Sequence, residues 1–266
     1  MMRPVWSMIQ RELIRFFRQP HRVVGSVAQP LIFWLFLGSG FSASFRAPGL
    51  HGISYLEYFF PGIILMLLLF SGIFSTITII EDRAQGLLQG ILVAPISRLA
   101  IVLGKVGGAM AVALSQVLLL LAATPFLGLH LGWEEGVLLL LGLLIATLGF
   151  TALGFLIAWH MESTAGFHAV MSVFLMPLWM LSGALFPMDQ TPGWLQWLMQ
   201  INPVTHALHL IRLPFYHQAG TLLGQAEYQT ALLVATLWAV GCLGLALWQV
   251  NRVECGLPPE AETAAG

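Results

Sequence analysis

The chain has 266 residues, of which 58% are hydrophobic and only 9% are charged, and its formal net charge is −1. Soluble domains usually carry about 25% charged residues, so this chain cannot cover a water-facing surface, and we expect most of its outer surface to face lipid. The near-zero net charge gives no support for nucleic-acid binding, and the two cysteines, one in an apolar run and one in the polar tail, do not suggest a disulfide framework.

The first predicted element is an amphipathic helix over residues 5–22, and we assign residues 1–22 to it as an interfacial helix. One face is apolar, and the opposite face carries four arginines in a stripe about 40° wide: Arg11, Arg15, Arg18 and Arg22. Such a helix lies flat in the membrane interface, with its arginines toward lipid phosphates or an acidic partner. The pattern fits a topology anchor and also a lever that contacts a cytoplasmic partner. We read no cleaved signal peptide in it.

Six stretches that lack Asp, Glu, Lys and Arg are long enough to cross a bilayer as helices, since a span needs about 20 apolar residues. They are Val23–Phe45, Tyr58–Ile80, Val106–Leu129, Val137–His160, Ala165–Met188 and Tyr228–Asn251. None shows the alternating pattern of a membrane barrel strand. The predicted fold is an all-α membrane protein, with a six-helix transmembrane domain over residues 23–251 and a cytoplasmic tail over residues 252–266.

The basic residues predict the orientation. With both termini in the cytoplasm, only Arg46 and Arg212 lie outside, and the other nine basic residues lie inside, as the positive-inside rule requires. We expect Lys105, near the start of the third span, to reach the interface by snorkelling. Small residues four apart, such as Gly104 and Gly108 or Gly142 and Ala146, predict close helix packing, either within one subunit or between two.

The cytoplasmic segment between the second and third spans begins with charged residues and continues as an apolar face at helical spacing. Pro95 is expected to end this helix, and Ser97 to cap the third span. A short helix rigidly joined to two spans would transmit a partner's movement to both. A plain amphipathic connector fits the spacing equally well.

This segment resembles the cytoplasmic signature of type-2 ABC exporter permeases: an acidic start, a glycine, a leucine pair, Ala-Pro-Ile-Ser-Arg, and then Gly104-Lys105. In that family the segment is the coupling helix that docks on the ATPase subunit. The resemblance implies this role for Glu81, Asp82, Arg83, Gly86, Leu88, Leu92, Pro95 and Arg98. The chain departs from the family at Gln89, where an acid is usual, so the polarity of the docking contact is open.

A second match follows the fifth span. The chain has a Leu-Ser-Gly-x-x-Phe-Pro turn, a Pro-x-Trp-Leu helix, and then Asn-Pro with a downstream arginine, Arg212. Pro187 and Pro192 are expected to stop the span, and the tryptophans favour a short helix dipping into the outer leaflet, although a surface helix is the alternative. In the family this re-entrant element belongs to the external gate, which implies that role for Ser182, Gly183, Phe186, Pro187, Trp194, Trp197, Asn202 and Pro203.

Energy for transport must come from another chain, because this one has no Gly-x-x-x-x-Gly-Lys-Ser/Thr phosphate loop. We therefore expect no cofactor here, and ATP and Mg in the partner ATPase. No catalytic motif is present, and His206 and His209 are interpreted as interfacial residues, so no metal site is expected. Ionisable residues deep in the spans, which ion-coupled carriers usually keep, are also missing.

The resulting hypothesis is the membrane-spanning permease subunit of an ATP-driven exporter for a hydrophobic or amphipathic, drug-like or lipid-linked substrate. The resemblance implies an ABC ATP-binding subunit and a second permease copy, most simply in a homodimer, in a bacterial or archaeal plasma membrane. Aromatic side chains in the spans are candidates for the substrate path: Phe33, Trp34, Phe70, Phe74, Phe174 and Trp179. A polysaccharide or glycolipid exporter of the same family, an ion-coupled carrier and a non-transporting membrane scaffold remain alternatives.

Overall fold

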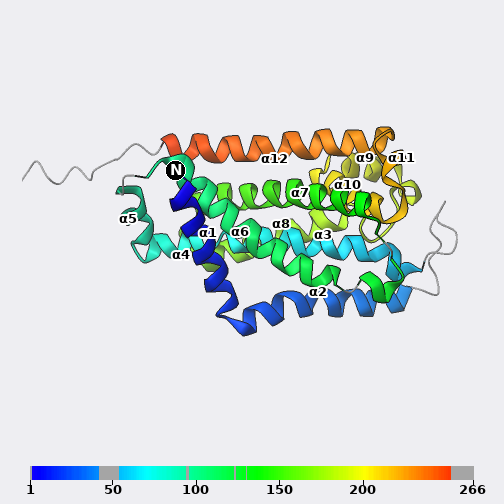
Figure 1. Ribbon diagram of the computed structural model, residues 1–266, viewed down its shortest axis with the longest axis horizontal. Coiled ribbons are helices and arrows are strands. Elements are labelled where there is room, and N and C mark those ends of the chain that lie inside the picture. Colours follow the sequence, from blue (N-terminus) through cyan, green and yellow to red (C-terminus); the bar gives the residue numbers. More distant parts are fainter. Residues whose placement is uncertain (1, 42–53, 94–95, 123, 130, 253–266) are drawn as a thin grey trace, which may run out of the picture.

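The computed structural model describes residues 2–41, 54–93, 96–122, 124–129 and 131–252, and within them it contains helices and no strand. The predicted all-α class is confirmed. Long helices run beside one another, and shorter elements gather at the two ends of this bundle (Figure 1). The long helices are α2 (Pro20–Phe41), α3 (Tyr55–Ser75), α6 (Arg98–Leu121), α7 (Trp133–His160), α8 (Thr164–Met180) and α12 (Ala226–Arg252).

Five helical stretches of the described chain are long and apolar enough to cross a membrane. They are Val23–Phe41, Tyr55–Ala84, Arg98–Leu121, Trp133–His160 and Ala226–Arg252. Each overlaps a predicted span, and the end of the first prediction, residues 42–45, lies outside the described residues. The third prediction, Val106–Leu129, is displaced, because the helix covers Arg98–Leu121. The second stretch includes a break at Thr76–Ile77, between α3 and α4 (Thr78–Ala84).

The predicted fifth span ends earlier than expected. Helix α8 has 17 residues and stops at Met180, which gives a length of about 25 Å against a hydrocarbon core of about 30 Å. Pro187 and Pro192 are therefore not what ends the helix. The chain turns at Leu181–Gly183, where Gly183 adopts a φ of +83° that other residues rarely take. Six complete spans remain a prediction.

The two ends of the bundle differ. At one, called here the α1 end, lie α1 (Met2–Phe17), α4 and α5 (Leu87–Val93), together with the last turn of α12 (Figure 1). At the other, the α9 end, lie α9 (Gly193–Ile201), α10 (Pro203–Tyr216) and α11 (Ala219–Leu222). Two short 3₁₀ turns, η1 (Thr124–Leu127) and η2 (Met188–Gln190), complete the order.

Helix α3 forms the centre of the molecule. Nearly all its side chains from Tyr55 to Leu69 are buried, and it packs against α2, α6, α7, α8 and α10. Glycines permit this packing: a Cβ on Gly62 would lie 2.9 Å from the Ala184 Cβ, and one on Gly142 would lie 2.8 Å from the Leu210 carbonyl oxygen. The Gly142 contact is therefore made within one subunit.

Candidate functional site

Helix α1 lies across the bundle and is seated on α6 (Figure 1). Its buried side chains are Met8, Glu12 and Phe16, spaced four residues apart on one face. Glycines of α6 lie beneath that face: a Cβ on Gly104 would be 2.5 Å from the Met8 sulfur, and one on Gly108 would be 2.7 Å from the Glu12 Cγ. Gly104 and Gly108 therefore allow close packing of α1 on α6 within the subunit, and the Glu12 carboxylate lies in that packed interface.

Glu12 belongs to a group of six charged side chains, called here the ion cluster. Helix α1 contributes Arg11, Glu12 and Arg15, α4 contributes Glu81 and Asp82, and α6 contributes Lys105. Three positive and three negative charges balance. The cluster joins three helices that lie far apart in the sequence, so it ties α1 and the predicted coupling segment to a membrane helix.

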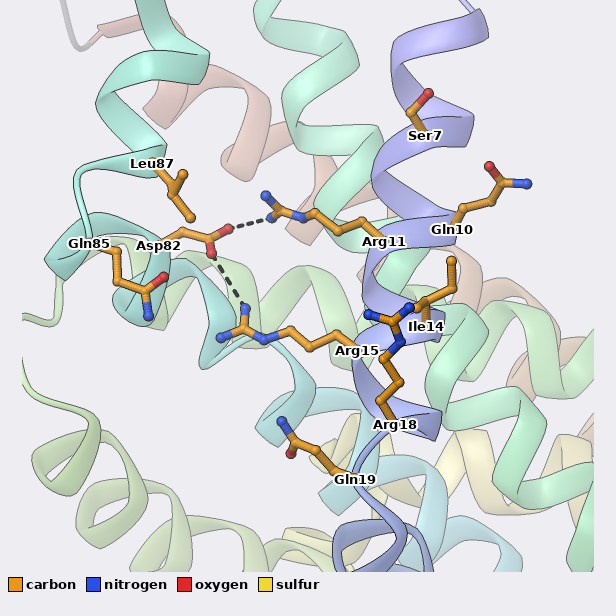
Figure 2. A pocket seen from close by; sticks show the side chains of 10 residues that line it. All are labelled: Ser7, Gln10, Arg11, Ile14, Arg15, Arg18, Gln19, Asp82, Gln85 and Leu87. Carbon is orange, nitrogen blue, oxygen red and sulfur yellow. Dashed lines mark hydrogen bonds and ion pairs between the residues drawn. The ribbon is translucent and has the colours of Figure 1, made fainter.

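Asp82 lies at the centre of the ion cluster. Arg11 Nη2 lies 2.5 Å from Asp82 Oδ2, and Arg15 Nη1 lies 3.4 Å from Oδ1 (Figure 2). Lys105 Nζ also contacts Asp82 Oδ2, and it lies 2.9 Å from Glu12 Oε1. The second arginine reaches further, since Arg15 Nη2 lies 2.6 Å from Glu81 Oε2.

The central members of the ion cluster are withdrawn from water. The exposed side-chain fractions are 1% for Asp82, 2% for Lys105 and 6% for Glu12. Burial lowers the pKa of Arg11, but the Asp82 and Glu12 carboxylates raise it by more, so its net pKa is raised and it stays charged. Ion pairs this deeply buried hold the helices in one arrangement, because removing one partner leaves a buried charge unpaired.

One expectation is corrected here. Lys105 does not snorkel to the interface, because two carboxylates hold its ammonium group inside the protein. Arg11 and Arg15 pair with Asp82 and Glu81 of the same chain, and their side chains remain 38% and 29% exposed.

Two further arginines of the segment hold the ends of membrane helices. Arg83 donates through Nη2 to the Trp159 carbonyl at 2.5 Å and through Nη1 to the Met161 carbonyl at 3.2 Å, at the end of α7. Arg98 donates to the Val250 carbonyl at 2.7 Å, at the end of α12. Cations are favourable at helix C-termini, where carbonyl groups lack partners. The segment is therefore bonded to α7 at its start and to α12 at its end.

The predicted single coupling helix is divided in two. Gly86 has a φ of +72° and separates α4 from the seven-residue α5. Leu88 is buried in the core, with 3% of its surface exposed, whereas Leu87 is 48% exposed and Val93 is 86% exposed. Ser97 caps α6 as predicted, accepting a bond from the Ala100 amide. Pro95 and the Leu92 side chain lie outside the described residues.

A cleft of about 760 Å³ separates α1 from α4 and α5 (Figure 2). Arg11 and Arg15 project into it from α1, and Asp82 faces them from α4. Arg18 lines its α1 side and Leu87 its α5 side. The Arg22 side chain lies outside the description. This cleft is bounded by a basic helix and by a helix with exposed apolar side chains.

At the α9 end, the turn after α8 is held by side chains from α3 and α10. Arg212 donates to the Gly183 carbonyl at 3.0 Å and to the Tyr58 hydroxyl at 3.2 Å. The Tyr58 hydroxyl donates to the same Gly183 carbonyl at 3.2 Å, and Tyr55 donates to the Leu185 carbonyl at 3.0 Å. The predicted gate residue Gly183 thus sits in a bonded turn.

The other predicted gate residues divide between a buried and an exposed group. Ser182 is buried and donates to the Trp179 carbonyl. Asn202 caps α10 by accepting from the Val204 amide at 3.0 Å, and Pro203 is the first residue of that helix, which was not predicted from the sequence. On α9, Trp194 and Trp197 are 67% and 62% exposed. Phe186 and Pro187 are half-buried in the link to η2.

A cavity of about 500 Å³ lies between α2, α3, α6 and α8, in the half of the bundle toward the α1 end. Phe70 and Phe74 line it, as do the polar side chains Ser26, Gln29, Ser71, Gln116, His168 and Ser172. Gln116 donates to the Ser71 hydroxyl at 2.7 Å, and the buried Gln116 Oε1 has no partner among the described residues. The lining combines aromatic rings with hydrogen-bonding side chains.

The remaining candidate path residues lie elsewhere. Trp34 and Trp179 are buried, and their indole groups donate to the Leu56 and Gly62 carbonyls at 2.9 Å in each case. Phe33 packs against the Trp179 ring. Phe174 is 60% exposed and borders a separate apolar hollow. The structure therefore brings only Phe70 and Phe74, of the six candidates, to the polar cavity.

Sequence reasoning did not single out Glu12 or Gln116. Glu12 carried a signal, because it is an acid in the middle of an arginine-rich helix, four residues from both Met8 and Phe16. A carboxylate at that spacing on an otherwise apolar face requires a buried cation. Gln116 is a lone amide in an apolar run, which indicates a hydrogen-bonding partner without identifying it.

Comparison with known proteins gives consistent matches over most of the chain. Residues 3–216 match the family described as ABC-2 type transporter. The chain is 29% identical over 218 residues to ycf38 of Cyanophora paradoxa, which is named as a transport permease, covering 81% of this chain and 75% of the relative. It is 29% identical over 195 residues to Nodulation protein J of Rhizobium meliloti strain 1021, covering 71% and 72%. It is 24% identical over 222 residues to the daunorubicin resistance ABC transporter permease protein DrrB1 of Streptomyces coeruleorubidus, covering 79% and 74%.

Proposed function

Because this chain belongs to the ABC-2 type transporter family, we propose that it is the permease subunit of an ABC exporter, powered by a separate ATP-binding subunit. It moves a hydrophobic or amphipathic substrate out of the cytoplasm or the inner leaflet. The observation that carries the proposal is the bonding of the coupling segment to α1, α6, α7 and α12.

The coupling mechanism follows from this bonding. A partner that pushes on α5 also moves Asp82, and the ion cluster passes that movement to α1 and α6. Arg83 passes it to α7, and Arg98 passes it to α12. Buried ion pairs resist separation, so the ends of these helices move together. The chain performs no chemical step, and the free energy comes from ATP binding and hydrolysis with Mg in the partner.

The docking surface in this proposal is the cleft between α1 and α5. Arg18 supplies positive charge on one side of the cleft and Leu87 supplies exposed apolar surface on the other, and Val93 adds exposed apolar surface at the far end of α5. Such a surface suits an ATPase segment that combines acidic and apolar side chains. Asp82 and Leu88 support this surface from within, because both are buried.

The α1 end is assigned to the cytoplasm of a bacterial or archaeal cell. Most basic residues of the described chain lie at this end, whereas Arg212 lies on α10. This distribution agrees with the positive-inside rule. The assignment places the start of α1, the end of α12 and the proposed docking cleft on the side where ATP is available.

The cavity between α2, α3, α6 and α8 is the proposed entry to the substrate path. Phe70 and Phe74 offer apolar contact, and Ser71, Gln116 and His168 offer hydrogen bonds. An amphipathic molecule with hydroxyl or amide groups matches this lining. One chain encloses only part of a route, so a second copy of the permease is proposed to complete it.

The proposal is tested by co-expressing the chain with its ATP-binding subunit and measuring co-elution. We expect Leu87→Asp and Val93→Asp to abolish co-elution while the isolated variants unfold at the wild-type temperature, because both side chains are exposed. Met2→Asp, at a side chain that is 86% exposed on α1 outside the cleft, is the matched control. Co-elution that survives both α5 changes, or a native chain that never holds the subunit, contradicts the proposed coupling.

A further inference from the structure

A second hollow at the α1 end, called here the α12 pocket, lies between α5 and the ends of α7 and α12. Its volume is about 660 Å³. It is bordered by Arg83, Gln89, Trp159, His160, Trp248 and Arg252. Two of the stretches long enough to span the membrane end at it, so the pocket lies at the membrane–water boundary.

The α12 pocket is basic. Arg83 and Arg252 both line it, and none of the described residues that line it carries a carboxylate. In the α1 cleft, by contrast, Asp82 pairs with two of the lining arginines, Arg11 and Arg15. The Arg252 guanidinium carbon lies 3.9 Å from the centre of the Trp248 ring. This cation–π contact holds the positive charge at the membrane–water boundary. A guanidinium group placed in this way is suited to a phosphate.

An apolar surface leads away from the same pocket. Helix α12 carries a series of exposed apolar side chains that begins at the pocket and continues toward the α9 end: Trp248, Leu245, Val240, Leu237 and Leu233. Acyl chains can lie along such a surface. A phospholipid with its headgroup in the pocket would place its acyl chains next to this surface, whereas a soluble phosphate would use the arginines alone.

We propose that the α12 pocket binds the headgroup of an anionic phospholipid, with the phosphate at Arg252, the charge of Arg83 (which stays bonded to the α7 carbonyls) lining the same pocket, and the acyl chains along α12. Basic pockets between membrane helices at the cytoplasmic side are suited to such headgroups. Gln89 of α5 borders the pocket, so a bound lipid bridges the coupling segment and α12. The resulting influence on coupling rests on the proposed function, whereas the binding itself does not.

The experiment titrates the purified chain, without any partner, with dioleoyl phosphatidylglycerol and with dioleoyl phosphatidylcholine, and counts bound lipids by native mass spectrometry. We expect Arg252→Gln to weaken phosphatidylglycerol binding about fivefold, which corresponds to about 1 kcal/mol for one basic residue. Gln89→Glu places a negative charge in the pocket, and we expect a similar loss. Both side chains are exposed, so neither change should alter thermal unfolding.

The matched controls are Arg3→Gln and Gln10→Glu, which make the same changes at exposed positions of α1 outside the pocket. We expect both to retain wild-type affinity. Equal losses in the pocket variants and the controls, or no loss in either, would overturn the proposal, because binding would then follow general surface charge. Competition by glycerol phosphate as effective as that by the lipid would also overturn it, by identifying a soluble phosphate as the ligand.

Discussion

Replacing Lys105 with methionine removes the buried ammonium group that both Glu12 and Asp82 contact. The remaining ion cluster carries two positive and three negative charges, and Glu12 keeps only Arg11 as a partner, at 3.2 Å. Breaking a buried pair by removing one partner typically costs about 3–5 kcal/mol. We expect the free energy of unfolding, measured by titrating sodium dodecyl sulfate into detergent-solubilised protein, to fall by about that amount.

A second change tests whether charge balance is the cause. Glu12→Gln added to Lys105→Met restores two positive and two negative charges and leaves Asp82 paired with Arg11 and Arg15. The double variant is therefore expected to recover about 2 kcal/mol relative to the single one, since residues in one network are coupled. Arg18→Met, at an exposed position directly after the same helix, is the control and should change stability by less than about 1 kcal/mol. The reasoning is refuted if Lys105→Met matches that control, or if the two cluster changes are simply additive.

Three further outcomes are expected in the same unfolding assay. Gly108→Ala places a Cβ against the Glu12 side chain and should lower the free energy of unfolding by about 1–3 kcal/mol. The control is Gly244→Ala in α12, where the added Cβ meets nothing within 4 Å, so stability should be unchanged or raised. Equal effects of the two changes would contradict the packing of α1 on α6. Arg212→Gln removes a charged donor to the Gly183 carbonyl and should lower the free energy of unfolding by about 2–4 kcal/mol. An unchanged unfolding midpoint would show that the turn after α8 does not depend on Arg212. Gly86→Ala should lower the free energy of unfolding by about 1 kcal/mol because Gly86 has a φ of +72°, even though no atom lies within 4 Å of the added Cβ. Unchanged stability would contradict the break between α4 and α5.

The elements that sequence predicts best are those determined by neighbouring residues. Ser97 caps α6 as its position indicated, because an N-cap needs only the backbone amides two or three residues further on. The span positions also follow from local composition, as in Tyr228–Asn251 against Ala226–Arg252.

The misplaced elements depend on contacts between distant segments. The end of α8 was assigned to Pro187, but a glycine in the left-handed region ends it earlier, and Arg212 and Tyr58 from other helices stabilise that turn. Lys105 was expected to snorkel, because the sequence does not show that Glu12 lies 2.9 Å away across a helix interface. Composition shows that a charge is present, and only packing shows its partner.

The central claim, that ATP binding to a separate subunit moves the α5 helices of two permease copies, is tested most directly by a distance. A spin label at Gly90→Cys, with Cys242 and Cys255 replaced by serine, reports the separation of α5 in one copy from α5 in the other, because Gly90 is exposed and does not line the cleft that is proposed to dock the ATPase. In lipid nanodiscs that contain the ATP-binding subunit, we predict a dipolar distance that shortens when ATP is added. A distance that ATP does not change, or the absence of any dipolar coupling between copies, would contradict the account.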